Sequence, residues 1–185
     1  MGKRSIDYPL IEAAKKDSAH FAPLYQKYFK QIFLYIFKKI QNEEITNDIA
    51  SQVFLKAMLN INKYEDRGYP FSSWLYTIAG NEVNLHFRKL KKNPEVEIQE
   101  KDVVSLLDDF NELPDENHQE LLVKAMNHLS ERDMEIIDLR YFEKLSFIEI
   151  GNILGITDNN AKIRLYRSVE MLRKTYKKLE VEEEI

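Results

Sequence analysis

The chain has 185 residues, of which 44% are hydrophobic and 31% are charged, a composition typical of a globular protein with one large or two small domains. Its formal net charge of −4 shows that the whole chain is not a polycation, so any binding of nucleic acid must come from local basic patches. The absence of cysteine excludes disulfides, thiolate catalysis and zinc held by cysteine.

The sequence predicts neither a targeting segment nor a membrane span. Residues 1–16 have no apolar core of the signal-peptide type, and no stretch of about 18 uncharged apolar residues occurs. The most apolar run, residues 31–40, is too short to span a membrane and predicts a buried helix. We therefore expect a cytoplasmic protein.

The N-terminal part predicts helices over residues 6–16, from Asp17 or Ser18 to residue 40, and over residues 43–61. Helical spacing along the second helix favours a core role over a cofactor-binding one for its apolar residues, which are Leu24, Tyr25, Tyr28, Phe29, Ile32, Phe33, Ile36, Phe37 and Ile40. The inner face of the third helix is expected to carry Ile45, Ile49, Val53 or Phe54, Ala57 and Ile61. Its outer face is expected to carry Asn47, Asp48, Ser51, Gln52 and Lys56.

A loop at residues 66–70 precedes a fourth predicted helix, residues 72–92. Gly80 in its interior costs about 1 kcal/mol relative to alanine. Its apolar side is expected to carry Trp74, Leu75, Ile78 and Leu85. Its end is basic, with His86, Arg88, Lys89, Lys91 and Lys92. These cations suit single-stranded nucleic acid, but they equally complement the dipole at a helix C-terminus, and the segment alone leaves both interpretations open.

Residues 93–118 carry nine acidic side chains and one basic one, which predicts a flexible linker between two domains. A functional alternative is that this acidic tether discourages the basic faces from binding DNA at random.

The C-terminal part predicts a helix-turn-helix. A helix near residues 121–129 and another capped by Ser130 come first, and Ser146 with Glu149 then forms a capping box. Gly155 permits positive φ at the turn, and Thr157 can cap the next helix. Helix, short glycine-containing turn, helix is the layout of many DNA-binding proteins.

The second helix of this motif has two faces. Residues at helical spacing are expected to pack inward, namely Ala161, Leu165, Val169 and Leu172. The outward set comprises Asn159, Lys162, Ile163, Tyr166 and Arg167, with Asn160 and Arg164 on its flank. Asparagine can pair with adenine, and arginine or lysine with guanine or phosphate, so this face suits the DNA major groove. The alternative is a solvated, salt-bridged helix in a bundle.

Four stretches together resemble an extracytoplasmic-function (ECF) RNA polymerase sigma factor: HFAPLYQKYFKQIFLYI, NDIASQVFLKAM, FSSWLYTIAGNEVNLHFRK, and the segment from HLSERDMEII to RSVEMLR. The resemblance implies an all-α protein of two small domains. Residues 1–92 resemble sigma region 2, residues 93–118 the linker, residues 119–179 the helix-turn-helix of sigma region 4, and residues 180–185 form an acidic tail.

The resemblance also implies roles for particular residues. Asp48, Gln52, Val53 and Phe54 fall on the surface that docks on core RNA polymerase. Asn81, Asn84, Arg88 and Lys89 fall in the segment that opens and reads the −10 promoter element as a single strand. Asn159, Asn160, Lys162, Ile163, Arg164, Tyr166 and Arg167 fall on the helix that reads the −35 element as duplex. The expected partners are the core polymerase, promoter DNA and an anti-sigma factor.

Some positions depart from the family pattern. Asn47 and Gln52 stand where acidic residues are usual, which removes negative charge from the docking surface. Asn159, Asn160 and Ala161 replace the common Gly-Thr-Val of the reading helix and could alter base preference.

The alternative to a sigma factor is a stand-alone helix-turn-helix regulator that binds duplex DNA as a homodimer. It leaves the first three stretches without a role. An enzyme is not expected, because the four histidines lie far apart without metal-ligand spacing and no phosphate loop or nucleophile elbow occurs. No metal or other cofactor is expected.

Overall fold

The computed structural model describes residues 4–66, 68–90, 106 and 116–183, and every regular element among them is a helix. The chain forms two compact units, Met1–Glu97 and Ile98–Ile185, here called unit 1 and unit 2. The predicted fold class, all-α with two small helical domains, is confirmed. Most of the expected acidic linker lies outside the described residues.

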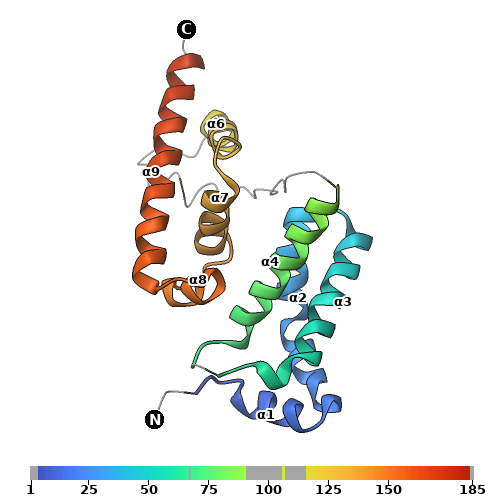
Figure 1. Cartoon of the computed structure of the whole chain (residues 1–185). Coiled ribbons are helices and arrows are strands. Elements are labelled where there is room, and N and C mark those ends of the chain that lie inside the picture. The colour runs from blue at the N-terminus through green and yellow to red at the C-terminus, as the bar shows by residue number, and fades with distance from the viewer. Residues whose placement is uncertain (1–3, 67, 91–105, 107–115, 184–185) are drawn as a thin grey trace. The chain divides into compact units, whose positions relative to one another are not determined.

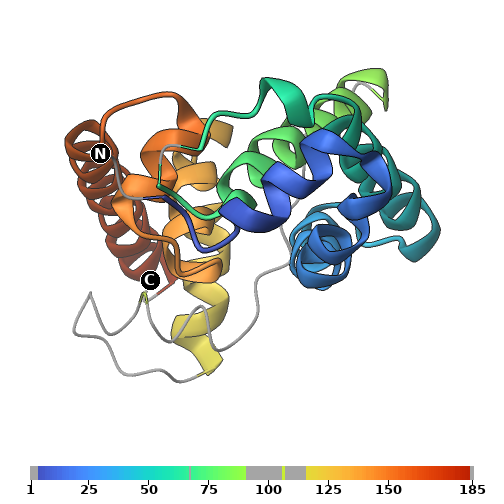
Figure 2. The same ribbon diagram turned by 90° about the horizontal axis from the view of Figure 1, so that it is seen from below.

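Unit 1 is a three-helix bundle with a shorter helix at one end. Helices α2, α3 and α4 pack against one another, and α1 lies across one end of them (Figures 1 and 2). In chain order the elements are α1 (Tyr8–Lys16), the 3-10 turn η1 (Ser18–Phe21), α2 (Ala22–Ile40), α3 (Glu43–Leu59), the 3-10 turn η2 (Ile61–Lys63) and α4 (Phe71–Leu90).

Local signals set these helix ends. The Asp17 side chain accepts a hydrogen bond from the Ala19 N–H (2.9 Å), and Asn42 accepts one from the Ile45 N–H (3.0 Å), so each satisfies a backbone donor at a helix start. Because Pro23 is best tolerated in the first turn of a helix, α2 begins at Ala22, after a separate 3-10 turn, rather than at Asp17 or Ser18 as expected.

The buried faces of unit 1 are wider than the predicted stripes, because each bundle helix packs against two neighbours. Tyr35 of α2 is buried, whereas Tyr25, Phe29, Phe33 and Phe37 lie partly exposed at its edge. On α3 the buried set includes Thr46 and Ala50 and both of the alternatives Val53 and Phe54, while Ile45 is only half-buried. On α4 it includes Phe71, Leu75, Tyr76, Ala79 and Val83, while Trp74, Ile78 and Leu85 are half-buried.

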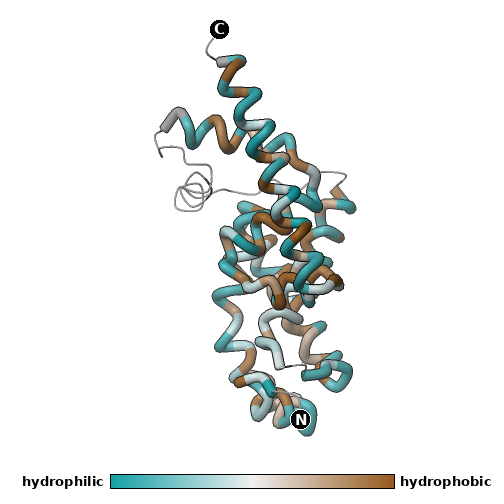
Figure 3. Tube along the Cα trace, turned by 90° about the vertical axis from the view of Figure 1, so that its left-hand side faces the viewer, coloured by the Kyte–Doolittle hydropathy of each residue, from teal (hydrophilic) through white to brown (hydrophobic). Residues whose placement is uncertain are grey.

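Unit 2 is built on one long helix. α6, α7 and α8 all pack against α9, and hydrophobic and hydrophilic residues alternate along α9, as expected of a helix with one buried side (Figures 1 and 3). In chain order the elements are α6 (Glu116–Met126), α7 (Glu131–Ile137), the π-helical turn η3 (Asp138–Phe142), α8 (Phe147–Leu154) and α9 (Asp158–Glu183). α6 begins three residues before the expected domain start at residue 119, and α9 continues into the expected tail.

Candidate nucleic-acid interface

The helix-turn-helix of α8 and α9 forms as the local sequence predicts. The Ser146 N–H donates to a Glu149 carboxylate oxygen (2.9 Å), and the Glu149 N–H donates to the Ser146 hydroxyl (3.3 Å), which completes the capping box. Gly155 ends α8 with φ of 67°, the left-handed conformation that glycine adopts at low cost. The prediction of positive φ at Gly155 is confirmed.

Gly151 is a residue that this turn requires and that sequence reasoning missed. It is buried in α8, and its carbonyl accepts hydrogen bonds from the N–H groups of Gly155 and Ile156. A Cβ atom at Gly151 would lie 2.8 Å from the Ile156 carbonyl oxygen and 3.2 Å from the Asp158 nitrogen. The close approach of α8 to the start of α9 therefore requires glycine here. A glycine inside a short predicted helix, four residues before the turn, is the available sequence signal.

The inner face of α9 follows the prediction and extends it. Thr157 caps the helix, since its hydroxyl accepts a hydrogen bond from the Asn160 N–H (3.1 Å). The buried residues are Ala161, Leu165, Ser168, Leu172 and Tyr176, and Val169 is half-buried. Ser168 and Tyr176 were not in the predicted set.

The outer face of α9 gathers six of the seven residues predicted to read duplex DNA. The exposed residues are Asn159, Asn160, Lys162, Ile163, Tyr166 and Arg167. Tyr166 is 60% exposed and Ile163 is 42% exposed, so both side chains are available to a partner. The Lys162 ammonium lies 5.8 Å from the centre of the Tyr166 ring, so cationic and aromatic groups share one surface.

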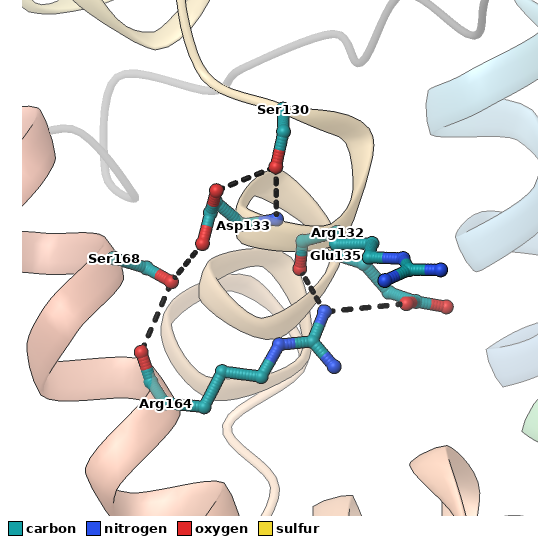
Figure 4. A network of polar contacts seen from close by, with 6 residues as sticks. All are labelled: Ser130, Arg132, Asp133, Glu135, Arg164 and Ser168. Atoms are coloured by element: carbon teal, nitrogen blue, oxygen red, sulfur yellow. Dashed lines mark hydrogen bonds and ion pairs between the residues drawn. The ribbon is translucent and has the colours of Figure 1, made fainter.

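Arg164, the seventh, is turned toward α7 instead. Its guanidinium donates a hydrogen bond to the carbonyl oxygen of Arg132 and lies 4.0 Å from the Glu135 carboxylate (Figure 4). The side chain therefore connects α9 to α7 from the flank of the outward face. Its spacing along α9 could not reveal this partner, which is supplied by a different helix.

Asp133 extends the same network between α7 and α9. The Ser168 hydroxyl donates to its carboxylate (2.6 Å), and so does the hydroxyl of Ser130, the N-cap of α7 (Figure 4). Burial alone would raise the pKa of Asp133, but the hydrogen bonds from Ser130 and Ser168 and the charge of Arg164 outweigh burial and lower that pKa below its usual value. The carboxylate is thus held ionised and fixes α7 against α9.

The four residues predicted to read single-stranded DNA are all exposed on the second half of α4. They are Asn81, Asn84, Arg88 and Lys89. Asn81, Asn84 and Arg88 follow helical spacing and share one face. Glu82 lies beside them but is turned to α3, where its carboxylate pairs with the Lys56 ammonium (2.5 Å). The exposed face therefore presents amides and cations.

The predicted polymerase-docking residues divide into two pairs. Asp48 and Gln52 are exposed on α3. Val53 and Phe54 are 0% and 3% exposed, so they are core residues that support this face from beneath and do not present side chains to a partner. The Phe54 ring packs against Tyr25 of α2 (ring centres 4.9 Å apart).

No group of histidine, cysteine, aspartate and glutamate in the described part of the chain has the arrangement of a metal site. Among the described helices, none is both long and apolar enough to cross a membrane.

Two family models match this chain in the order of its units. Sigma-70 region 2 matches residues 24–93, and Sigma-70, region 4 matches residues 125–174. The ECF RNA polymerase sigma factor SigW of Bacillus subtilis is 30% identical over 188 residues, covering 91% of this chain and 95% of SigW. The ECF RNA polymerase sigma factor BldN of Streptomyces coelicolor is 29% identical over 172 residues, covering 88% of this chain but only 63% of BldN.

Solved structures show the same fold. CnrH, in complex with the cytosolic domain of CnrY, matches with a TM-score of 0.58 and 16% identity, covering 90% of this chain and 94% of CnrH. The sigma factor RpoE of Bartonella quintana, in complex with the anti-sigma factor NepR, matches with a TM-score of 0.55 and 19% identity, covering 85% of this chain and 96% of RpoE.

A stand-alone homodimeric regulator would account for the helix-turn-helix of unit 2 but not for a region 2 match across unit 1. The order of the two regions, the exposed face of α9 and the likeness to SigW along nearly the whole chain agree with one another. The chain belongs to the ECF family of RNA polymerase sigma factors, which bind the core polymerase and direct it to promoters.

Proposed function

We propose that residues 1–92 and residues 119–179 act as two DNA-binding domains of one promoter-recognition subunit, joined by the acidic linker 93–118 and followed by an acidic tail. The C-terminal domain contacts the −35 element as duplex, and the N-terminal domain captures the −10 element as a single strand. The single observation that carries this proposal is the exposed face of α9, where Asn159, Lys162, Tyr166 and Arg167 stand together.

Within that face we assign base reading to Asn159, Asn160, Lys162 and Ile163, and contact with both backbone and bases to Tyr166 and Arg167. An amide or a guanidinium can form paired hydrogen bonds with a base edge, and an exposed isoleucine can contact a thymine methyl group. Arg164 acts indirectly, because its guanidinium is bound to α7. Its role is to orient the reading helix.

On α4 we assign the single strand to Asn81, Asn84, Arg88 and Lys89. Amides can hydrogen-bond to the edges of unpaired bases, and the two cations at the end of the helix neutralise phosphates. All four side chains are exposed, as this assignment requires.

Docking on the core polymerase is assigned to the exposed face of α3, with Asp48 and Gln52 as the contacting residues and Val53 and Phe54 as its support. Asn47 is exposed beside them. Since Asn47 and Gln52 carry no charge, this docking surface is less acidic than the family pattern, and Asp48 takes a larger share of any attraction to a basic partner.

We further propose that the protein acts in the cytoplasm and is restrained by an anti-sigma factor. Among solved structures of the same fold, RpoE is in complex with the anti-sigma factor NepR, and CnrH is in complex with the cytosolic domain of CnrY. The partly exposed aromatic edge of α2, formed by Tyr25, Phe29, Phe33 and Phe37, offers apolar surface to such a partner.

Run-off transcription with core polymerase tests the main proposal. A library of randomised duplex templates is transcribed with and without the protein, and enriched templates are sequenced. We expect a defined start site with the native protein and its loss with Lys162→Ala plus Arg167→Ala, because removing both cations removes base and phosphate contacts.

The matched control is Lys177→Ala plus Lys178→Ala, which removes the same charge from exposed positions farther along α9. This variant should weaken all templates about equally and keep the start site. If the native protein adds no start-site preference to core polymerase, or if both double variants behave alike, the proposed assignment is wrong.

A further inference from the structure

The N-terminal segment makes contacts that reach the start of α4, although it lies before residue 24, where the match to sigma region 2 begins. Ser5 and Asp7 contact Asp66 and Phe71, more than 60 residues away in the sequence. Asp66 belongs to the loop that precedes α4, and Phe71 is the first residue of α4.

Asp7 is a buried residue whose carboxylate accepts hydrogen bonds from two other helices, α2 and α4. It is 0% exposed, and it accepts hydrogen bonds from the Lys27 ammonium, the Tyr28 hydroxyl (2.5 Å) and the Phe71 N–H (3.3 Å). It occupies the N-cap position of α1 but makes no side-chain hydrogen bond to that helix. The carboxylate therefore stabilises contacts between segments and not its own helix start.

The contact with Phe71 matters because the residue directly before α4 cannot cap the helix with its side chain. Pro70 stands before the first residue of α4, and proline has no side-chain acceptor. The first N–H groups of a helix lack partners within the helix, and negative charge there is favourable. Asp7 supplies both the acceptor and the charge from the other end of unit 1's sequence.

A second carboxylate fastens the loop itself. Asp66 accepts hydrogen bonds from the Ser5 N–H (3.1 and 3.2 Å to its two oxygens) and from the Ser5 hydroxyl (3.0 Å). It also accepts one from the Gly68 N–H (2.8 Å). Asp66 thus links the N-terminal segment to the chain just before α4. We call the set Ser5, Asp7, Asp66 and the Phe71 N–H the N-terminal clasp.

An aromatic cluster beside the clasp includes the only tryptophan of the chain. Tyr64, in the loop, has its ring centre 5.2 Å from that of Phe71 and 5.1 Å from that of Trp74, and the rings of Phe71 and Trp74 are 5.5 Å apart. Trp74 is half-buried in the first turn of α4. Its fluorescence can therefore report the packing of that turn.

We propose that the N-terminal clasp fixes the first turn of α4 and so orients the helix whose second half captures the −10 strand, which makes Ser5 and Asp7 positioning residues for promoter opening. This inference rests on the proposed function of α4. Asp7 and Asp66 act through the backbone they hold and do not contact DNA.

The test compares Asp7→Asn and Asp66→Asn in the full chain with Asp17→Asn. Asp17 is an exposed residue of unit 1 that caps only the adjacent turn η1, so it is a control for the loss of one carboxylate. Asp66 is only half-buried, and its variant keeps the test valid if Asp7→Asn does not fold. Circular dichroism checks folding, and Trp74 emission reports the first turn of α4 in the free protein.

Holoenzymes are then assembled on a template enriched by the native protein. We expect both clasp variants to protect the −35 region as the native holoenzyme does. Reactivity of unpaired −10 thymines to permanganate should fall by about tenfold, as expected for the loss of a hydrogen bond to a charged group. Trp74 emission should shift in both variants and remain native in Asp17→Asn.

A purely structural clasp gives a different result. If folded variants show a lower melting temperature but native Trp74 emission and native permanganate reactivity at saturating holoenzyme, the positioning role is refuted. If the native holoenzyme opens no template, the proposed function fails instead, and the Trp74 measurement on the free protein still decides whether the clasp orders the start of α4.

Discussion

Arg164 shows how one side chain on the helix proposed to face DNA can tie that helix to its neighbour. It lies one residue after Ile163 and three before Arg167, both exposed, yet its guanidinium binds the Arg132 carbonyl and faces Glu135. Under the proposed function, the contribution of Arg164 to DNA binding is to orient α9. Arg167 has no such contact among the hydrogen bonds and ion pairs described above.

Replacing each of these arginines by glutamine should separate the two roles. Arg164→Gln should lower the free energy of unfolding by about 1–2 kcal/mol, because it removes a charged hydrogen-bond donor between α7 and α9. Arg167→Gln should change that free energy by less than about 0.5 kcal/mol, as surface substitutions usually do, but should abolish −35 selectivity. Urea unfolding and run-off transcription measure the two effects. Equal destabilisation by both changes would contradict the assignment.

At the scale of the element, two glycines inside helices differ in the room that a side chain would have. Gly151 allows α8 to approach the start of α9, and a Cβ atom there would meet backbone at 2.8 Å. Gly80 of α4 has room for a Cβ atom, whose nearest neighbour would be the Tyr35 hydroxyl at 3.6 Å, an ordinary contact distance. Close packing therefore does not explain the glycine at position 80.

Alanine at the two positions should change stability in opposite directions. Gly151→Ala should destabilise the protein by roughly 1–3 kcal/mol through overpacking against the turn and should weaken −35 binding. Gly80→Ala should stabilise it by roughly 0.5–1 kcal/mol, since alanine is the better helix former. Thermal unfolding of the two variants checks the signs. A destabilised Gly80→Ala would show that α4 needs glycine for a reason other than packing.

Much of the fold and part of the site could be predicted from patterns within single helices. Helical spacing identified the exposed face of α9, and local capping signals identified Ser146, Gly155 and Thr157. Helical spacing could not show that Arg164 turns to α7 or that both Val53 and Phe54 are buried, because those outcomes depend on which neighbouring helix packs against the residue. Hydrogen bonds between Ser5 and Asp66 span 61 positions and leave no local pattern at all.

For the whole molecule, the proposed function, with two DNA-binding domains on one chain, would explain how a protein of net charge −4 binds DNA selectively. Neither basic face needs to bind tightly alone, since binding of one domain raises the effective concentration of the other at the same promoter. The negative charge elsewhere on the chain disfavours non-specific contact with phosphates.

Each unit also contains an ionised carboxylate that ties its helices together, Asp7 in unit 1 and Asp133 in unit 2. Burial would raise the pKa of Asp7, but hydrogen bonds from Lys27, Tyr28 and the Phe71 N–H lower it below 3.8, and the pKa of Asp133 is also lowered. In the unfolded chain these groups take up protons near their ordinary pKa, while in the folded chain they do not. The stability they contribute is therefore complete above about pH 4 and is lost as the pH falls through the lowered values.

We accordingly expect both units to lose stability in the same acidic range. Urea unfolding followed at pH 7, 5 and 3 should show a loss mainly between pH 5 and 3, and Asp7→Asn and Asp133→Asn should each reduce that loss while lowering stability at pH 7. A loss that is unchanged in both variants would show that other carboxylates govern acid unfolding.

The clasp has a practical consequence for building hybrid factors. If residues 24–93 of this chain were moved into a relative, with cuts at the boundaries of the matched family model, Asp66 and Phe71 would move without Ser5 and Asp7. Such a chimera would carry all of α4 without the Ser5 and Asp7 that fasten its first turn in this chain, and it would need equivalent residues from the relative. Crossover points placed before Ser5 keep the donor and acceptor groups together.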